Sequence, residues 1–262
     1  MSELDKLHAE VLPNPEADQP RIAYANAVQK TDPERAELIR VQLQLTHSRR
    51  KGLPPLDRAD AYTRESVLLD RHKDEWSKSV NGVRGVLFVR FLRGFVEQVR
   101  MSARDFLDHG DRLYARAPIL HLDLVEVKPH ARELFQSPLL DRLHSLRLTR
   151  NQLGDDEARL LAASPHLGRL RWLDLTYNQI GQSGLEAICA GTGIPSLRFL
   201  DFADNAALDP TPKIGETDPS TNEIVALEVP PAARELEARF GKKPWLSFEL
   251  VGTMFPPERD LF

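Results

Sequence analysis

The chain has 262 residues, a net charge of −4 and 41% hydrophobic residues, which is typical of a globular protein and argues against disorder and against a strongly basic nucleic-acid-binding surface. Its single cysteine, Cys189, excludes an intrachain disulfide, and acidic first residues and short apolar runs argue against a signal peptide and a membrane span. We therefore expect a monomeric protein of a bacterial-type cytoplasm, with no nucleic acid and no membrane as partner.

Residues 1–82 have the pattern of a helical module. Ser2 can cap a first helix whose apolar residues, spaced by three and four, run from Leu4 to Val11. Asp32 followed by proline has the N-cap arrangement that begins another helix. After a linker at 52–55, three side chains spaced by four predict a long helix: Leu68, His72 and Trp76.

Residues 83–118 are expected to form a hairpin and a helix that lead from the helical module into the repeats. Alternation of period two on both sides of Arg93-Gly94 predicts a β-hairpin that ends at Met101. Ser102 and Asp105 then have the spacing of a capped helix start.

A repeat of the form LxxLxLxxN dominates residues 119–205. Three gap-free copies end at Asn151, Asn178 and Asn205, so that each interval is 27 residues and the three asparagines are expected to stack one above another. An earlier copy without the asparagine begins at Ile119. This spacing and pattern are those of leucine-rich repeats. In each copy the alternating leucines predict a short strand, the asparagine a tight turn, and the following residues a helix.

The fold class that follows is α/β: a short leucine-rich-repeat solenoid, with a parallel sheet and helices on its convex side, preceded by the helical module and hairpin. Residues 206–222 lack periodicity and are rich in Pro, Asp and Thr, so we expect a surface loop there. A C-terminal cap is expected over 223–262, with a helix from Pro231 to Phe240 ended by Gly241 and a last strand containing Leu246, Phe248 and Leu250.

The N-terminal sequence resembles a known family. The segments 10–25 and 32–43, which include Arg21, Asp32-Pro33 and Gln42, look like the bacterial repeat-companion domain, and Arg93-Gly94-Phe95-Val96-Glu97 resembles a segment of its leucine-rich members. The resemblance implies a leucine-rich-repeat fold and a protein-interaction role, and it implies no catalytic residues. The chain departs from the family at Asn26-Ala27, where the family has Asp-Trp.

The residues between the buried leucines should lie in columns on the open, concave face of the sheet. The first column contains His121, Ser145, Trp172 and Phe199, and the second contains Asp123, Arg147, Asp174 and Asp201. Two outer columns follow them: Val125, Thr149, Thr176 and Ala203, and then Glu126, Arg150, Tyr177 and Asp204.

Adjacent large aromatic residues on an exposed face suit the centre of an interface. We therefore expect a non-catalytic protein-binding module whose partner has a basic, apolar patch. The predicted contact residues are Trp172, Phe199, Asp174, Asp201, Arg147, Tyr177, His121 and Asp123. Alternatively, the cap or the 206–222 loop covers Trp172 and Phe199. Three exposed side chains on each of five strands give about 15 residues, fewer than the 20–30 of a standard interface.

Other function classes remain open at this point. The protein could neutralise a toxin or effector as an immunity or inhibitor protein, or the N-terminal module could serve only to cap the repeats. A small-molecule enzyme would have to use a pocket holding His121, Asp123 and Arg147. No metal-ligand spacing or phosphate-binding loop is present in the sequence, and we expect no metal and no cofactor. Cys189 lies on an apolar helical stripe and is expected to be a buried, inert thiol.

Overall fold

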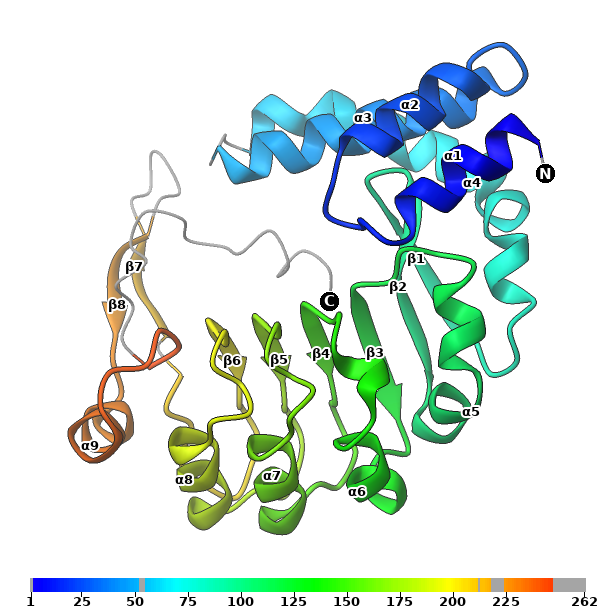
Figure 1. The fold of residues 1–262 in the computed structure, drawn as a ribbon. Coiled ribbons are helices and arrows are strands. Elements are labelled where there is room, and N and C mark those ends of the chain that lie inside the picture. The colour runs from blue at the N-terminus through cyan, green and yellow to red at the C-terminus, as the bar shows by residue number, and fades with distance from the viewer. Residues whose placement is uncertain (1, 52–54, 212, 218–223, 247–262) are drawn as a thin grey trace. The chain divides into compact units, whose positions relative to one another are not determined.

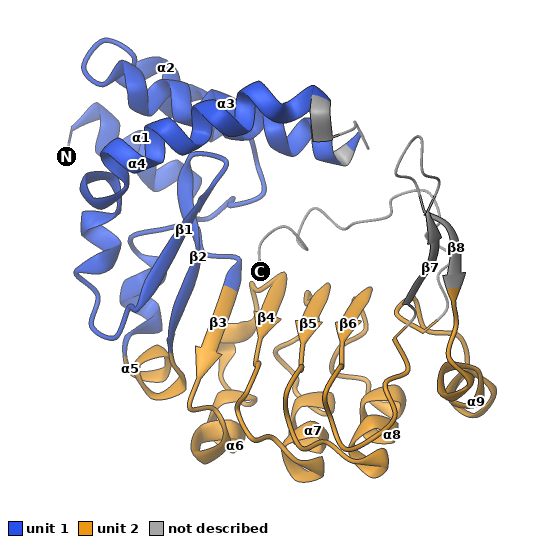
Figure 2. Ribbon diagram, turned by 180° about the vertical axis from the view of Figure 1, so that it is seen from behind, with its two compact units in different colours: residues 1–101, 109–121, 255–262 blue, residues 102–108, 122–254 orange. Residues whose placement is uncertain are grey.

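The computed structural model describes residues 2–51, 55–211, 213–217 and 224–246, which divide into two compact units. Unit 1 contains the chain up to Met101 together with His109–His121. Unit 2 contains Ser102–Asp108 and the described residues between Leu122 and Leu246 (Figure 2).

The helices of unit 1 begin where the sequence provides caps. Ser2 Oγ accepts the backbone N–H of Asp5 at 3.1 Å, and the Asp5 carboxylate accepts the N–H of Ser2 at 2.7 Å, which completes a capping box. Asp32 accepts the N–H of Arg35 at 2.8 Å, as the Asp-Pro pair predicted. The helices are α1 (Glu3–Val11), α2 (Gln19–Val28), α3 (Pro33–Arg50) and α4 (Ala59–Asn81), the last preceded by a 3₁₀ turn at Pro55–Arg58.

The sequence pattern gave no indication of α2 as a separate helix. Its buried side chains are Arg21, Ala25 and Val28, so that an arginine stands where an apolar residue is expected on the inward face. The linker expected at 52–55 falls largely on residues 52–54, which lie outside the described residues.

The predicted hairpin is present, and its turn explains the Arg-Gly pair. Strands β1 (Phe88–Leu92) and β2 (Phe95–Ser102) are antiparallel, and Leu92 pairs with Phe95 across a two-residue loop. Arg93 and Gly94 both have positive φ, 49° and 84°, as the tight hairpin turn that matches strand twist requires. A Cβ on Gly94 would lie 2.2 Å from Ile39 Cγ1. The turn therefore packs directly on α3 and has no room for a side chain.

In unit 2 the repeats form alternating strands and helices. Helices α6, α7 and α8 lie along one side of the strands (Figure 1). After α5 (Ala103–Tyr114) the elements are β3 (His121–Val125), α6 (Ala131–Leu134), β4 (Ser145–Arg147), α7 (Asp155–Ala162), β5 (Trp172–Asp174), α8 (Gln182–Ala190) and β6 (Phe199–Asp201). Short 3₁₀ turns at Lys128–His130 and Pro138–Leu140 flank α6.

The sheet has six strands in sequential order, β1 to β6, and it is mostly parallel. Strand β4 pairs with β5 and β5 with β6 in parallel, which confirms the predicted parallel sheet for these three repeats. The strand leucines are buried, and Leu200 is the most exposed of them at 5%. The helix residues Leu161, Leu185 and Cys189 are each at most 1% exposed. The core of unit 2 therefore lies between the strands and the helices, as the period of 27 predicted.

The C-terminal part differs from the prediction. Residues 206–222 were expected to form a loop, but Lys213–Thr217 form β7, which pairs antiparallel with β8 (Ile224–Glu228) in a separate two-stranded sheet. Helix α9 (Pro231–Phe240) is confirmed, and it ends at Gly241 with φ 77°. Leu246 is buried but lies in a turn, and Phe248 and Leu250 of the expected last strand lie outside the described residues.

Candidate functional site: the repeat face and its exposed ridge

The strand residues of successive repeats lie in register. Ser145 pairs with Trp172 and Trp172 with Phe199, and in the same way Arg147 pairs with Asp174 and Asp174 with Asp201. The residues of one predicted column are therefore neighbours in the structure across β4, β5 and β6. This part of the sheet is called the repeat face below, and it comprises the first two columns.

The repeat asparagines maintain this register. Asn178 Oδ1 accepts the backbone N–H groups of Asn151 and Leu153, both at 3.0 Å. Its Nδ2 donates to the carbonyl oxygens of Leu148 and Leu175 at 2.9 and 2.8 Å. Each asparagine side chain thus replaces the strand hydrogen bonds that end at the turn.

The same arrangement recurs on both sides of Asn178. Asn151 Oδ1 accepts the N–H of Val127 at 2.8 Å, and Asn205 Oδ1 accepts the N–H of Ile180 at 3.1 Å. The three asparagines form a ladder of side chains, and the prediction that they stack is confirmed.

The first column is more buried than predicted. Trp172 is 3% exposed and His121 is 5% exposed, and Ser145 is fully buried. The expectation of an open aromatic pair is therefore wrong for Trp172. Its ring stacks on Phe199, which is half-buried, with 5.7 Å between ring centroids and 28° between planes. Of the two aromatic residues, only Phe199 retains an accessible surface that a partner could contact.

Asp174 is a second predicted contact residue that the fold encloses. Its Oδ1 accepts the N–H of Thr176 at 2.9 Å and the Thr176 hydroxyl at 2.7 Å, and its Oδ2 lies 3.2 Å from Arg147 Nε. Asp174 is 6% exposed, whereas Arg147, Asp123 and Asp201 are half-buried. Asp174 therefore holds its strand end and Arg147 in place, and the accessible charges of this column are on its neighbours.

All four residues of the fourth column, which follow the strands, are exposed. We call this set of four residues the ridge: Glu126, Arg150, Tyr177 and Asp204. Tyr177 is 50% exposed, and the Arg150 guanidinium carbon lies 4.5 Å from the centre of its ring, a cation–π contact. Tyr177, one of the predicted contact residues, is thus the exposed aromatic residue of the ridge, whereas Trp172 is buried.

A buried ionic cluster in unit 1 contains several of the residues that carried the family resemblance. Arg21 is fully buried, and its Nη1 lies 2.8 Å from Glu97 Oε1. Arg93 donates to both oxygens of the same carboxylate, from Nε at 3.1 Å and from Nη2 at 2.9 Å. Both arginines also donate to the carbonyl oxygen of Pro15, at 2.7 Å. Burial lowers the pKa of Arg21 to about 10, against the opposing effect of Glu97.

The cluster fixes the hairpin to the helices. Arg35 is 7% exposed and lies over three rings, at 5.0 Å from Trp76 and 5.3 Å from Phe91 and Phe95. Gln42 accepts the N–H of Gly94 at 2.6 Å and donates to the Phe91 carbonyl at 2.9 Å. These contacts all lie within unit 1, so they explain why the residues are needed for the fold. Two buried nitrogen atoms of the arginines, Arg21 Nε and Arg35 Nη1, have no hydrogen-bond partner there.

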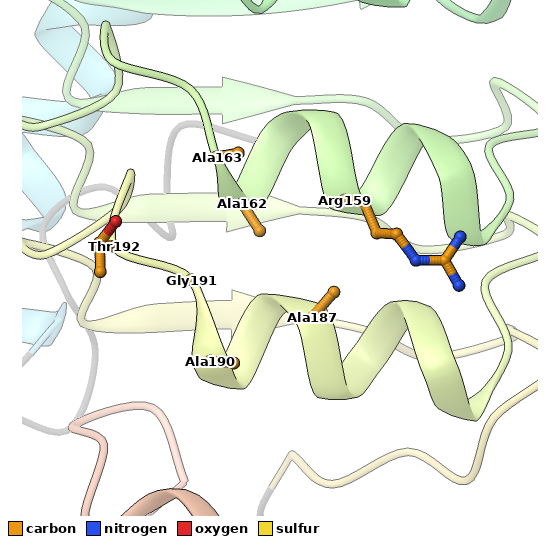
Figure 3. A pocket seen from close by; sticks show the side chains of 7 residues that line it. All are labelled: Arg159, Ala162, Ala163, Ala187, Ala190, Gly191 and Thr192. Atoms are coloured by element: carbon orange, nitrogen blue, oxygen red, sulfur yellow. The ribbon is translucent and has the colours of Figure 1, made fainter.

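Other candidates for chemistry have structural explanations. Burial raises the pKa of the Cys189 thiol to about 11, which keeps it protonated and inert, as expected. A hollow of about 310 Å³ lies between α7 and α8 (Figure 3). Its lining is mostly small, and it comprises Arg159, Ala162, Ala163, Ala187, Ala190, Gly191 and Thr192. Arg159 is already bound to Asp156 at 2.6 Å and to Ser183 at 2.8 Å.

The residues considered for an enzyme are not gathered in that hollow. His121 belongs to unit 1, and Asp123 and Arg147 belong to unit 2. Within the described ranges no group of three or more His, Cys, Asp or Glu side chains could hold a metal ion. No helix in the described part of the chain is long and apolar enough to cross a membrane.

Comparison with known proteins agrees with the geometry of unit 2. Residues 170–189, which contain β5 and most of α8, match the family model of the leucine-rich repeat. No curated protein matches the chain. The match supports a leucine-rich-repeat protein, and repeats of this kind generally mediate protein–protein binding.

Proposed function

We propose that the protein is a non-catalytic, cytoplasmic protein-binding module. Its repeats would form a short solenoid with the repeat face on the concave side, and its first 82 residues would be a bacterial repeat-companion domain. The observation that carries the proposal is the in-register pairing of β4, β5 and β6, since it aligns side chains that are distant in sequence into one surface.

The chemistry of this surface favours a partner with a basic, apolar patch. The second column contains Asp123, Asp174 and Asp201 against one basic residue, Arg147, and this arginine already lies 3.2 Å from Asp174. Phe199 adds an aromatic side chain beside Asp201. Complementary charge on a partner would direct its approach, and the aromatic residue would provide apolar contact area.

The burial of Trp172 determines how this proposal can be tested. Replacing a buried tryptophan by alanine costs about 3–5 kcal/mol, so loss of binding by Trp172→Ala would not distinguish contact from misfolding. Asp201→Lys is a better change, because this side chain is half-buried at the surface and its replacement reverses one charge.

The experiment is affinity capture of partners from the native cytoplasm with the full chain. We expect Asp201→Lys to reduce capture at least about tenfold at low salt, because it places like charges opposite each other. Glu235→Lys is the matched control, an equal charge reversal at an exposed position on α9 of the same unit. Equal capture by both variants and the wild type would refute the repeat face as the binding surface.

A further inference from the structure

The ridge residues share a backbone conformation that their side chains do not favour. Glu126, Arg150, Tyr177 and Asp204 have φ of 56°, 59°, 57° and 57°. This left-handed region is open to glycine at no steric cost and is unfavourable for residues with a Cβ. Each of these four side chains is nevertheless large or charged, and each is exposed. They are therefore held on the surface at a cost in backbone conformation, which points to a role outside the core.

Hydrogen bonds place the ridge residues side by side, and the bond from the Val127 N–H to Asn151 Oδ1 sets Glu126 in the same row. The N–H of Arg150 donates to the Thr176 carbonyl at 3.2 Å, next to Tyr177. The N–H of Tyr177 donates to the Ala203 carbonyl at 3.0 Å, next to Asp204. The asparagine ladder lies directly beyond them and fixes the same spacing. The ridge is consequently a preformed row that needs no rearrangement to present its side chains.

The order of charges along the row is informative. A carboxylate lies at each end, at Glu126 and Asp204, and the Arg150–Tyr177 pair lies in the middle. Four neighbouring strands are separated by three intervals of about 4.8 Å, so that the two carboxylates are about 14 Å apart. An extended peptide rises about 3.4 Å per residue and covers this distance in about four residues.

Resting on the proposed protein-binding function, we propose that the ridge binds an extended segment of the partner that carries two Lys or Arg residues about four positions apart with an apolar residue between them. The two basic side chains pair with Glu126 and Asp204, and the apolar residue contacts the exposed part of the Tyr177 ring. Arg150 excludes a third basic residue from the middle of the segment, because like charges at close range are unfavourable.

A short extended segment of a partner fits the ridge better than a large folded surface of a partner does. The repeats offer about 15 side chains, fewer than the 20–30 of a standard interface, and part of the first column is buried. A peptide across the strand ends needs only the ridge. The segment would be a local element of the partner, and its recognition would depend on the spacing of its charges.

The test is an NMR titration of the isotopically labelled full chain with three synthetic peptides of Gly and Ser. The first has two arginines four positions apart with a leucine between them, the second has the same composition with the arginines adjacent, and the third has glutamates in place of the arginines. We expect the first to bind at least about fivefold more tightly than the second, and the third not to bind. The amide signals that shift should be those of the ridge and of the asparagine ladder.

The variant Glu126→Gln/Asp204→Asn should weaken binding of the first peptide about three- to tenfold, as expected for two exposed ion pairs. Glu235→Gln, an exposed neutralisation on α9, should leave binding unchanged. Equal binding of the first two peptides, an unaffected double variant, or no binding of any peptide would overturn the proposal. Signal changes confined to Arg147, Phe199 and Asp201 would also overturn it and would leave the repeat face as the binding surface. The proposed function itself fails only in the separate capture experiment with Asp201→Lys.

Discussion

Unit 1 and unit 2 satisfy their buried polar groups in different ways. In unit 1 one cluster of charged residues joins distant parts of the chain, and Arg93 reaches the carbonyl oxygen of Pro15 from 78 positions away. In unit 2 one type of asparagine hydrogen bond recurs at intervals of 27 residues. The cluster occurs once and has no substitute, whereas the ladder distributes its bonds over several similar steps. A single substitution in the cluster should therefore cost unit 1 much of its stability. Substitutions of the asparagines in unit 2 should have smaller costs that differ from one repeat to the next.

The largest effect is expected for Glu97→Ala. Its carboxylate is the common partner of Arg21 and Arg93, and removing it leaves two buried positive charges with only Asp18, 3.8 Å from Arg93, as a nearby carboxylate. Loss of one member of such a group costs about 3–5 kcal/mol. Hydrogen exchange should show the loss of protection in α1–α3 and the hairpin before unit 2 is affected. The exposed Glu133→Ala is the control, and a change in urea midpoint as small as that of the control would refute the role of the cluster.

Gly94→Ala should destabilise unit 1 by about 2–4 kcal/mol. The new Cβ would clash with Ile39 of α3, and alanine would be strained at a φ of 84°. Gly168→Ala is the matched control, because a Cβ there would meet no atom within 4 Å. Equilibrium urea unfolding measures both variants, and similar midpoints would show that the hairpin turn is not held against α3.

In unit 2 we expect the stability cost of replacing a ladder asparagine to depend on how many buried groups it bonds. Asn178→Ala should cost about 2–3 kcal/mol, because it leaves buried N–H and carbonyl groups of two neighbouring repeats unpaired. Asn205→Ala should cost about 1–2 kcal/mol, since Asn205 is half-buried and its Oδ1 accepts the N–H of Ile180. Thermal unfolding of both variants checks the order. If Asn205→Ala were the more costly change, the ladder would not be the element that distributes stability.

The smallest effect concerns pH and His8 of α1, whose ring lies near Tyr24 and Phe95. Burial, and then the charge of Arg35, lower the pKa of His8 below its ordinary value of 6.5. The folded state therefore favours neutral His8, and its stability falls as the pH drops below about 6.5. His8→Leu should lose less stability than the wild type between pH 7.5 and 5 in urea titrations. An equal loss would show that other groups cause the pH dependence.

The positions of the repeats were predictable because each one makes the same local bonds as its neighbours. The leucines and asparagines of unit 2 took the predicted places, and Asn151, Asn178 and Asn205 stack as expected. Helix α2 was not predictable from hydrophobic periodicity, because Arg21 occupies its buried face and needs Glu97 and the Arg93 carbonyl as partners. One signal for this helix was available in the sequence. The segment lacks an apolar stripe, yet Arg21 and Glu97 both belong to the segments that carry the family resemblance.

For the candidate site, the sequence by itself determined which side chains share a column, since a strand period of two and a repeat of 27 residues settle this. Only the tertiary structure decided which columns are accessible. It buried Trp172 and Asp174, left Tyr177 half exposed, and placed strand β7 where a loop was expected. The physical reason is that register depends on bonds between adjacent repeats, whereas exposure depends on every segment that packs against a surface, including segments far away in the sequence.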